Sequence, residues 1–392
     1  SLSFTKTDSF GLHTDVQPVL NTEFLTSPDG MLPAQEIVSV RNGLLHLPTR
    51  ELLPHDPRFF TLNSLPFAYD ADAPKPVEWL KFLEGIWPND PESIGLLQRW
   101  FGYMLSSDTS HQKLMLLIGP PRSGKGTIAA TMKTLLGGEA NVAGPRLSAF
   151  GSNFGLEPLI GKRAAIVGDA RLSSKVDQGE IVGSLLGITG EDTLTIDRKN
   201  RTAWTGVLPA RITICTNELP RLQDASGALA SRFLVLKMEK SFLGQEDRGL
   251  GARIQSELPG ILKWALDGWN ALQHEGRFPS PEASRDSLGA LDELVSPIRA
   301  FISEMCEVDV TASASCQEVY ASWCEWCVRQ GREHPGTLQS FGRDLAAAVA
   351  GVKVTQPRNG NEKRRRVYEG IRLHQRDAGV GYTKSVVCVN AD

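Results

Sequence analysis

A glycine-rich segment carries the clearest chemistry in this sequence. Residues 119–127 read GPPRSGKGT and lie between an apolar run at 113–118 and a stretch of helical periodicity at 128–136. A loop between a strand and a helix binds phosphate because its N–H groups turn inward, the helix N-terminus adds positive charge, and a lysine reaches the β- and γ-phosphates. The sequence therefore predicts an ATP-binding loop formed by Gly119, Pro120, Pro121, Arg122, Ser123, Gly124, Lys125, Gly126 and Thr127.

A magnesium ion bound with ATP needs oxygen ligands near this loop. The residue after the loop lysine is usually Ser or Thr, but here it is Gly126, so the next hydroxyl, that of Thr127, is the expected Mg²⁺ ligand. Asp169 follows the apolar run 164–167, where an NTPase needs an acidic residue to hold the metal or polarise water. Because this carboxylate stands alone, we expect Asp169 to serve both purposes. The alternative is an ordinary turn residue at a strand end.

Two further side chains are candidates for the hydrolysis step. Asn217 follows the apolar run 211–215, and its amide, which both donates and accepts, can orient a water molecule against the γ-phosphate. Arg232 precedes the run 233–236 and is a candidate arginine finger for the phosphate site of a neighbouring subunit, with Arg221 a weaker candidate. A turn asparagine and a surface ion pair are the structural alternatives.

Two basic segments are candidates for DNA contacts. Residues 194–204 hold two strand-like runs joined by a polar basic turn, and a basic hairpin tip contacts phosphates of any sequence. A second cluster, near the C-terminus, would contact duplex DNA through its phosphates. A solvated turn is the alternative in both places. The candidates are Arg198, Lys199 and Arg201 in the first segment, and Lys363, Arg364, Arg365 and Arg366, with Arg358, Arg372 and Arg376, in the second.

The elements that must position these residues follow from the spacing of apolar positions. Between 113 and about 240, apolar runs of strand length alternate with glycine-punctuated helical stretches, which indicates an α/β sandwich. A turn-rich β segment and two helices within 76–106 precede it. The predicted domains are 1–108, a β-rich segment with a helical collar; 109–275, the ATPase; 276–290, a linker; and 291–392, a winged-helix-like domain.

The last of these domains is predicted from three helices and a β-hairpin. Helical periodicity covers 297–305, 317–329 and 338–349, and strand-like runs cover 352–355 and 367–373. Cys316, Cys324, Cys327 and His334 suggest zinc, but two of these cysteines lie in a helical run where they pack as small apolar residues, and no second pair completes a tetrahedral set. We therefore expect no metal site there.

Composition excludes several classes of protein. A chain of 392 residues with 41% hydrophobic and 22% charged residues is globular and long enough for several domains. The net charge of −3 excludes nucleic-acid binding by bulk basicity, and six scattered cysteines are typical of a reduced, cytoplasmic protein without disulfides. Apolar runs are far shorter than the ~20 residues of a membrane span, so no membrane partner is expected. The first residue is Ser1, which suggests a fragment of a longer chain.

The order of these motifs resembles superfamily III helicases, specifically the C-terminal helicase region of phage and plasmid primases of the poxvirus type. The resemblance implies an AAA+ core in a ring, usually a hexamer, with ATP at subunit interfaces between Lys125 and Asp169 of one subunit and Arg232 of the next. It also implies a hairpin whose Lys199 grips single-stranded DNA in the central channel. It is carried by SVRNGLLHLPTRELLPHDPRFF, PVEWLKFLEGIWPNDPESIGLLQRWFGYML, GPPRSGKGT, ITGEDTLTIDRKN, ITICTNELPRL, SRFLVLKME and SELPGILKWALDGWNAL.

The leading hypothesis is an ATP-driven helicase that moves on single-stranded and fork DNA during phage, plasmid or other mobile-element replication. The sequence leaves open whether a primase or polymerase domain precedes Ser1 in the full chain. Two alternatives stay open. The string Gly-Lys-Gly-Thr also occurs in nucleoside monophosphate kinases, which act as monomers without DNA. The lone Asp169 and the glycine at 126 also fit a nucleotide-gated DNA-binding assembly factor with negligible turnover.

Overall fold

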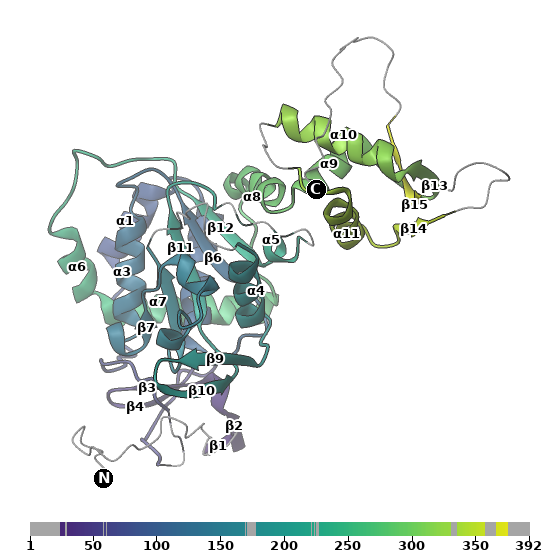
Figure 1. The fold of residues 1–392 in the computed structure, drawn as a ribbon. Helices are drawn as coiled ribbons and strands as arrows, with labels where there is room; N and C mark the ends of the chain where they lie inside the picture. Colours follow the sequence, from purple (N-terminus) through teal and green to yellow (C-terminus); the bar gives the residue numbers. More distant parts are fainter. Residues whose placement is uncertain are drawn as a thin grey trace, which may run out of the picture. The chain divides into compact units, whose positions relative to one another are not determined.

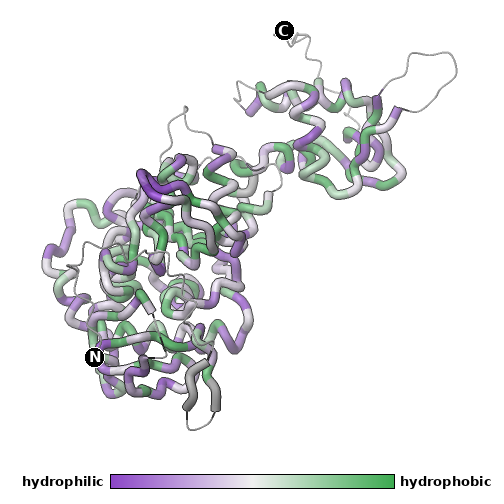
Figure 2. Tube along the Cα trace, turned by 60° about the horizontal axis from the view of Figure 1, so that its bottom comes forward, coloured by the Kyte–Doolittle hydropathy of each residue, from purple (hydrophilic) through white to green (hydrophobic). Residues whose placement is uncertain are grey.

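The chain forms two compact units, which are described separately. The computed structural model describes residues 24–27, 30–57, 59, 61–168, 170, 178–220, 222, 224, 227–330, 335–356 and 366–374. The core unit comprises Ser1–Pro220 and Arg232–Ser287, and the C-terminal unit comprises Arg221–Ser231 and Leu288–Asp392 (Figure 1). Within the core unit, the hydrophobic stretches of the chain run through the interior and hydrophilic residues follow the outside (Figure 2).

A five-stranded sheet in which every pairing is parallel forms the centre of the core unit. Its strands are almost wholly buried, which explains why their sequences read as continuous apolar runs rather than as alternating patterns. In Figure 1, helices α3 (Lys125–Leu135) and α4 (Gln178–Thr189) are drawn on opposite sides of the strands. The sheet order is β12 (Phe233–Lys237), β6 (Leu114–Ile118), β11 (Arg211–Thr216), β8 (Ala164–Val167) and β7 (Val142–Ala143).

Two further helices of the core unit touch backbone to backbone. Helices α2 (Pro91–Leu105) and α7 (Leu258–Glu275) approach so closely that a Cβ at Gly102 would lie 2.3 Å from the backbone nitrogen of Trp269. Between α6 (Leu250–Ser256) and α7, the Glu257 carboxylate accepts the N–H groups of Glu78 and Trp79 at 3.0 Å. This carboxylate caps α1 (Val77–Ile86) and fixes it to the core unit. The two helices expected within 76–106 are thus confirmed as α1 and α2.

Small antiparallel sheets and short helices complete the core unit. The turn-rich N-terminal region is β-rich, as predicted, and β3 pairs with β4 in antiparallel register. The sheets are β1 (Phe24–Ser27) with β2 (Gly30–Pro33); β3 (Ile37–Val40), β4 (Gly43–His46) and β5 (Leu52–Leu53); and β9 (Leu194–Arg198) with β10 (Arg201–Gly206). The 3₁₀ helices are η1 (Ala34–Glu36), η2 (Gly138–Ala140), η3 (Leu147–Gly151) and η4 (Glu157–Leu159).

The C-terminal unit packs three helices against a three-stranded antiparallel sheet of order β13, β15, β14. Its core is aromatic, with Phe301, Trp323 and Phe341 in mutual ring contact at centroid distances of 5.4 to 6.1 Å. The elements are α9 (Pro297–Met305), β13 (Cys306–Ser315), α10 (Cys316–Arg329), α11 (Leu338–Ala348), β14 (Lys353–Thr355) and β15 (Val367–Leu373). The predicted bounds of α9 and β15 are confirmed without change.

Several elements differ from the sequence-based expectation, and three of them have a clear physical reason. Strand β13 was not predicted, because CEVDVTASAS contains few large apolar residues and its register with β15 shifts between Val308 and Ser313. Helix α8 (Glu282–Val295) begins inside the expected linker, because serines supply part of its buried face. The short helix α5 (Ala228–Arg232) also had no apolar signal. No helix in the described part of the chain is both long and apolar enough to cross a membrane.

Candidate nucleotide site and basic hairpin

Residues 119–124 connect β6 to α3, as the sequence predicted, and Lys125, the first residue of α3, folds back onto this loop. The Lys125 Nζ donates hydrogen bonds to the carbonyl oxygens of Gly119 (2.6 Å) and Pro120 (2.8 Å) and to the Ser123 hydroxyl (3.1 Å). Burial lowers the pKa of the Lys125 ammonium, and the nearby Cys215 opposes this shift. The lysine is thus held at the loop by neutral oxygen atoms, which an anionic ligand can replace.

The backbone of this loop suits anion binding. Arg122 and Gly124 adopt left-handed conformations, with φ of 60° and 101°, and Gly124 caps α3 without a side-chain hydrogen bond. Glycine suits this position because a φ of 101° is a conformation that L side chains rarely adopt. Left-handed residues in such a turn direct successive N–H groups inward, and the α3 N-terminus adds its partial positive charge.

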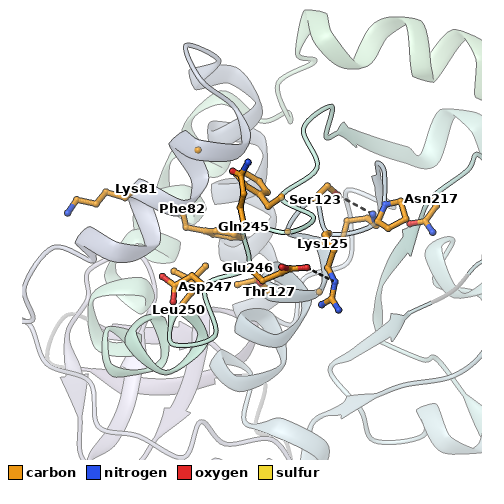
Figure 3. Close-up of a pocket in the computed structure, with 16 residues that line it drawn as sticks. Lys81, Phe82, Ser123, Lys125, Thr127, Asn217, Gln245, Glu246, Asp247 and Leu250 are labelled. Atoms are coloured by element: carbon orange, nitrogen blue, oxygen red, sulfur yellow. Dashed lines mark hydrogen bonds and ion pairs between the residues drawn. The ribbon is translucent and has the colours of Figure 1, made fainter.

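A cavity of about 620 Å³ opens at the loop, and it brings Lys125, Thr127 and Asn217 together (Figure 3). Asn217 reaches it because β6 and β11 are parallel neighbours in which Thr216 pairs with Ile118, so both strands end at the same edge of the sheet. The cavity has the size of a small-molecule site, which typically spans ~300–1,000 Å³. Asn217 and residues 121–127 of the expected ATP-binding segment therefore line one cavity, whereas Gly119 and Pro120 are not part of its lining.

The other wall of the cavity was not predicted from the sequence. It consists of Lys81, Phe82 and Gly85 on α1 and of residues within 242–250. The second segment is bound to the loop, since the Ser241 hydroxyl donates to Pro121 O (2.8 Å) and the Phe242 N–H donates to Arg122 O (2.9 Å). Phe82 carried a visible signal, but its helical spacing indicated a core residue rather than a cavity wall.

Asp169 and Arg221 lie outside the described residues. The strand that leads to Asp169 is described: β8 ends at Val167 and pairs in parallel with β11. The carboxyl end of β8 is therefore at the same sheet edge as Asn217 and the phosphate loop. The placement of the Asp169 carboxylate itself stays a prediction.

Arg232 lies at the opposite edge of the sheet. Its Nη1 donates to the Thr189 hydroxyl (2.8 Å) and to Leu186 O (3.3 Å), in the last turn of α4. The next residue, Phe233, pairs with Leu114 at the start of β6, whereas the phosphate loop follows the end of β6. Five residues of strand span about 16 Å. The core unit therefore does not bring Arg232 to its own Lys125. Burial, with the charge of Arg232, lowers the pKa of the neighbouring Lys113.

The predicted basic hairpin is confirmed as β9 and β10, with Lys199 and Asn200 as its turn. Lys199 and Arg201 are exposed at the tip. Arg198 differs from this pattern: it is only 8% exposed, and its Nε donates to Thr202 O (2.7 Å) across the hairpin. Lys199 and Arg201 are therefore exposed to solvent, whereas Arg198 stabilises the turn of the hairpin.

The second basic cluster is only partly described. Arg366 is exposed next to the first residue of β15, and Arg372 is exposed and paired with Glu307 at 2.8 Å. Cys316, Cys324 and Cys327 are buried in the aromatic core of the C-terminal unit. Lys363, Arg364 and Arg365, together with Arg358, Arg376 and His334, lie outside the described residues.

Two protein-family models match the chain. Residues 27–88 match a model described as "D5 N terminal like", and residues 117–232 match a family of unknown function, DUF5906. The second match contains every residue expected to act in ATP hydrolysis. The first covers the N-terminal segment and α1, where the resemblance to phage and plasmid primases begins.

Solved structures with a similar arrangement include two of the NrS-1 C-terminal region in its apo state. One is 14% identical, with 88% of this chain and 83% of that chain covered and a TM-score of 0.49. The A form of the same region is 14% identical, covers 77% of each chain and has a TM-score of 0.45.

Proposed function

We propose that this chain is an ATP-hydrolysing, ring-forming helicase of superfamily III that moves on single-stranded DNA in phage or plasmid replication. The observation that carries this proposal is the separation of two sets of polar groups. Lys125, Thr127 and Asn217 line a cavity where the parallel strands of the sheet end, which we call the carboxyl edge. Arg232 lies where the strands begin, which we call the amino edge. A site divided in this way is complete only between two copies of the chain.

The cavity residues have distinct roles in this proposal. Lys125 exchanges its carbonyl partners for the β- and γ-phosphates, and Asn217 orients the attacking water. Gly126 lines the cavity, and a Cβ there would meet no atom within 4 Å, so the phosphates have room to approach the backbone. Thr127 and Asp169 would hold Mg²⁺, which supplies neutralisation of phosphate charge when bound. Hydroxyl and carboxylate oxygens are ligands that suit this hard cation.

We propose a ring because Arg232 lies away from the phosphate loop of its own chain. In a heterologous, head-to-tail assembly one copy presents its phosphate loop and the next copy presents its amino sheet edge. Arg232 would leave the carbonyl and hydroxyl of α4 for the γ-phosphate of the neighbouring copy, where its charge stabilises the transition state. The partner is therefore another copy of this chain, in a ring that we propose to be hexameric.

DNA contacts are assigned to two places. Lys199 and Arg201 at the hairpin tip would hold the phosphates of a single strand. The C-terminal unit runs helix, strand, two helices and two strands, an order that supports a winged helix. Arg366 and the cluster 363–365 would contact duplex DNA at the fork through its phosphates.

The test is the ATPase rate with and without single-stranded DNA, at several salt concentrations. We expect DNA to stimulate the rate, and Lys199→Ala to lower the stimulated rate by about 10-fold or more, because phosphate contacts dominate such affinity. Lys75→Ala removes another exposed lysine and is the matched control, with a rate equal to wild type.

Each alternative function predicts a different result. Phosphoryl transfer to a nucleoside monophosphate without DNA would indicate a kinase. DNA binding with negligible turnover would indicate an assembly factor. An ATPase rate that changes neither on addition of DNA nor in Lys199→Ala contradicts the helicase proposal.

A further inference from the structure

The short helix that ends at Arg232 is shared by the two compact units. The chain from Arg221 to Ser231 belongs to the C-terminal unit, whereas Arg232, the last residue of α5, belongs to the core unit. The proposed function gives this arginine a role at the phosphate site of a neighbouring copy, and such a role requires an accurately placed guanidinium. The contacts that hold α5 therefore decide where Arg232 lies.

Asp224 holds the start of α5. Its backbone N–H donates to the carbonyl oxygen of Val295, the last residue of α8, at 2.7 Å. One of its carboxylate oxygens accepts the N–H of Leu229, in the first turn of α5, at 2.8 Å. Asp224 is only 8% exposed, and Leu229 is fully buried. The side chain thus satisfies an N–H group at the start of a helix, while the backbone of the same residue fixes the turn to the C-terminal unit.

The turn between Asp224 and α5 is also confined by α9. Gly227 has a φ of 68°, its N–H donates to Asp224 O at 3.1 Å, and a Cβ there would lie 2.6 Å from the guanidinium carbon of Arg299. Glycine adopts this left-handed conformation without strain, and its lack of a side chain leaves room for the arginine. Arg299 belongs to α9, whose Phe301 lies in the aromatic core. The turn that starts α5 is therefore built into the C-terminal unit.

The end of α5 is held by neutral groups of the core unit. The Arg232 guanidinium donates to the Thr189 hydroxyl at 2.8 Å and to Leu186 O at 3.3 Å. An anionic phosphate attracts a guanidinium more strongly than these neutral oxygen atoms do. The side chain can therefore exchange its partners, whereas the backbone of α5 is set at its other end by Asp224.

We infer that Asp224 is a positioning residue for Arg232: it fixes α5, and α5 places the guanidinium for the phosphate of the neighbouring copy. This inference rests on the proposed function, since it adds the residue that places the arginine finger. Asp224 does not line the nucleotide cavity. Its loss should therefore slow the hydrolysis step and leave nucleotide binding unchanged.

The experiment measures kcat and KM for ATP with the full chain and saturating single-stranded DNA. Asp224→Ala should lower kcat by about 10- to 100-fold, the cost of displacing a catalytic group by about 1 Å, and leave KM within about twofold. Asp224→Asn keeps an oxygen that can accept the Leu229 N–H, so its kcat should stay within about threefold of wild type.

Asp90→Ala is the matched control, because the Asp90 carboxylate accepts the Ser93 N–H at 2.9 Å at the start of another helix, α2. It should lower Tm by about 2–4 °C and leave kcat within about twofold. Thermal melting verifies the folding of every variant. If Asp224→Ala does not fold, Gly227→Ala replaces it. Alanine is strained at a φ of 68°, so this variant should lower kcat by about 3- to 10-fold at unchanged KM.

A double variant separates positioning from a general structural role. In an Arg232→Ala background, Asp224→Ala should change the rate by less than about twofold, because the arginine that it places is already absent. An equal loss in both backgrounds, an unchanged kcat in the folded variant, or an Asp224→Asn rate as low as that of Asp224→Ala overturns the positioning role and leaves the proposed function intact. A wild-type chain that hydrolyses no ATP, or a full rate in Arg232→Ala, contradicts the proposed function itself.

Discussion

The two edges of the five-stranded sheet both hold cationic side chains, but in different surroundings. At the carboxyl edge, Lys125 donates to loop oxygens beside an open cavity. At the amino edge, a cation begins or directly precedes each of β6, β8, β11 and β12. These residues are Lys113, Arg163, Arg211 and Arg232.

The arginines in the middle of the amino edge are enclosed. Arg163 is 8% exposed and donates to Leu105 O, and burial lowers its pKa to about 10. Arg211 is 3% exposed, donates to Pro209 O at 2.8 Å and lies 4.9 Å from the centroid of the Tyr103 ring. Lys125 also donates to carbonyl oxygens, so the cations at the two edges do not differ in the kind of group that they bind. What separates them is an adjoining cavity through which a ligand can replace those partners.

Arg232 is predicted to be the exception at the amino edge, and its removal should have the largest effect. Arg232→Ala should lower the ATPase rate by about 10³- to 10⁵-fold without unfolding the protein, because the neighbouring site loses its arginine finger. A steady-state ATPase assay measures this loss.

Mixing variants tests whether Arg232 acts between copies. Lys125→Ala should be inactive alone, but a 1:1 mixture with Arg232→Ala should recover up to about a quarter of the wild-type rate, since some interfaces then join two intact halves. If the mixture recovers no ATPase activity, or if Arg232→Ala alone has a normal rate, Arg232 has a structural role like that of Arg163 and Arg211.

Replacing Arg163 should have the second-largest effect, which is a loss of stability. Arg163→Ala should lower the free energy of unfolding by about 2–4 kcal/mol, because it leaves the buried Leu105 carbonyl without its charged donor. Lys125→Ala should change it by less than about 1 kcal/mol, because water from the cavity can replace the lysine. Urea denaturation measures both, and equal losses would remove the distinction between the two edges.

The smallest effect concerns the exposed ion pairs at the cavity rim. Arg253 contacts Glu78 (2.8 Å) and Asp247 (2.6 Å), and hydrogen bonds from Arg253 lower the pKa of both carboxyls below 4.5 and 3.8. Their stabilisation is complete above those ordinary values and is lost as the pH falls through the depressed ones. Arg253→Ala should therefore lower Tm by at most about 2 °C at pH 7 and converge with wild type in acid. Arg248→Ala is the control, and parallel Tm curves for the Arg253 variant would contradict this account.

The phosphate end of the site was predictable because its signal is local. Glycines, lysine and a strand-to-helix transition occur within a few residues, and the long strands of the sheet are continuous apolar runs. The wall formed by residues 242–250 had no such signal, because this segment takes its place through contacts such as Ser241 with Pro121, which are 120 positions apart. Likewise, no pattern distinguished the buried Arg198 from the exposed Lys199.

The contact between α2 and α7 limits how this protein can change over time. At Gly102 and Gly268 a Cβ would lie 2.2 to 2.5 Å from backbone atoms of the facing helix, and backbone cannot rotate aside as a long side chain can. Only hydrogen fits at either position. A residue larger than glycine at either position would force α2 and α7 apart, and α7 begins next to the Glu257 carboxylate that caps α1, the helix whose Lys81, Phe82 and Gly85 line the cavity.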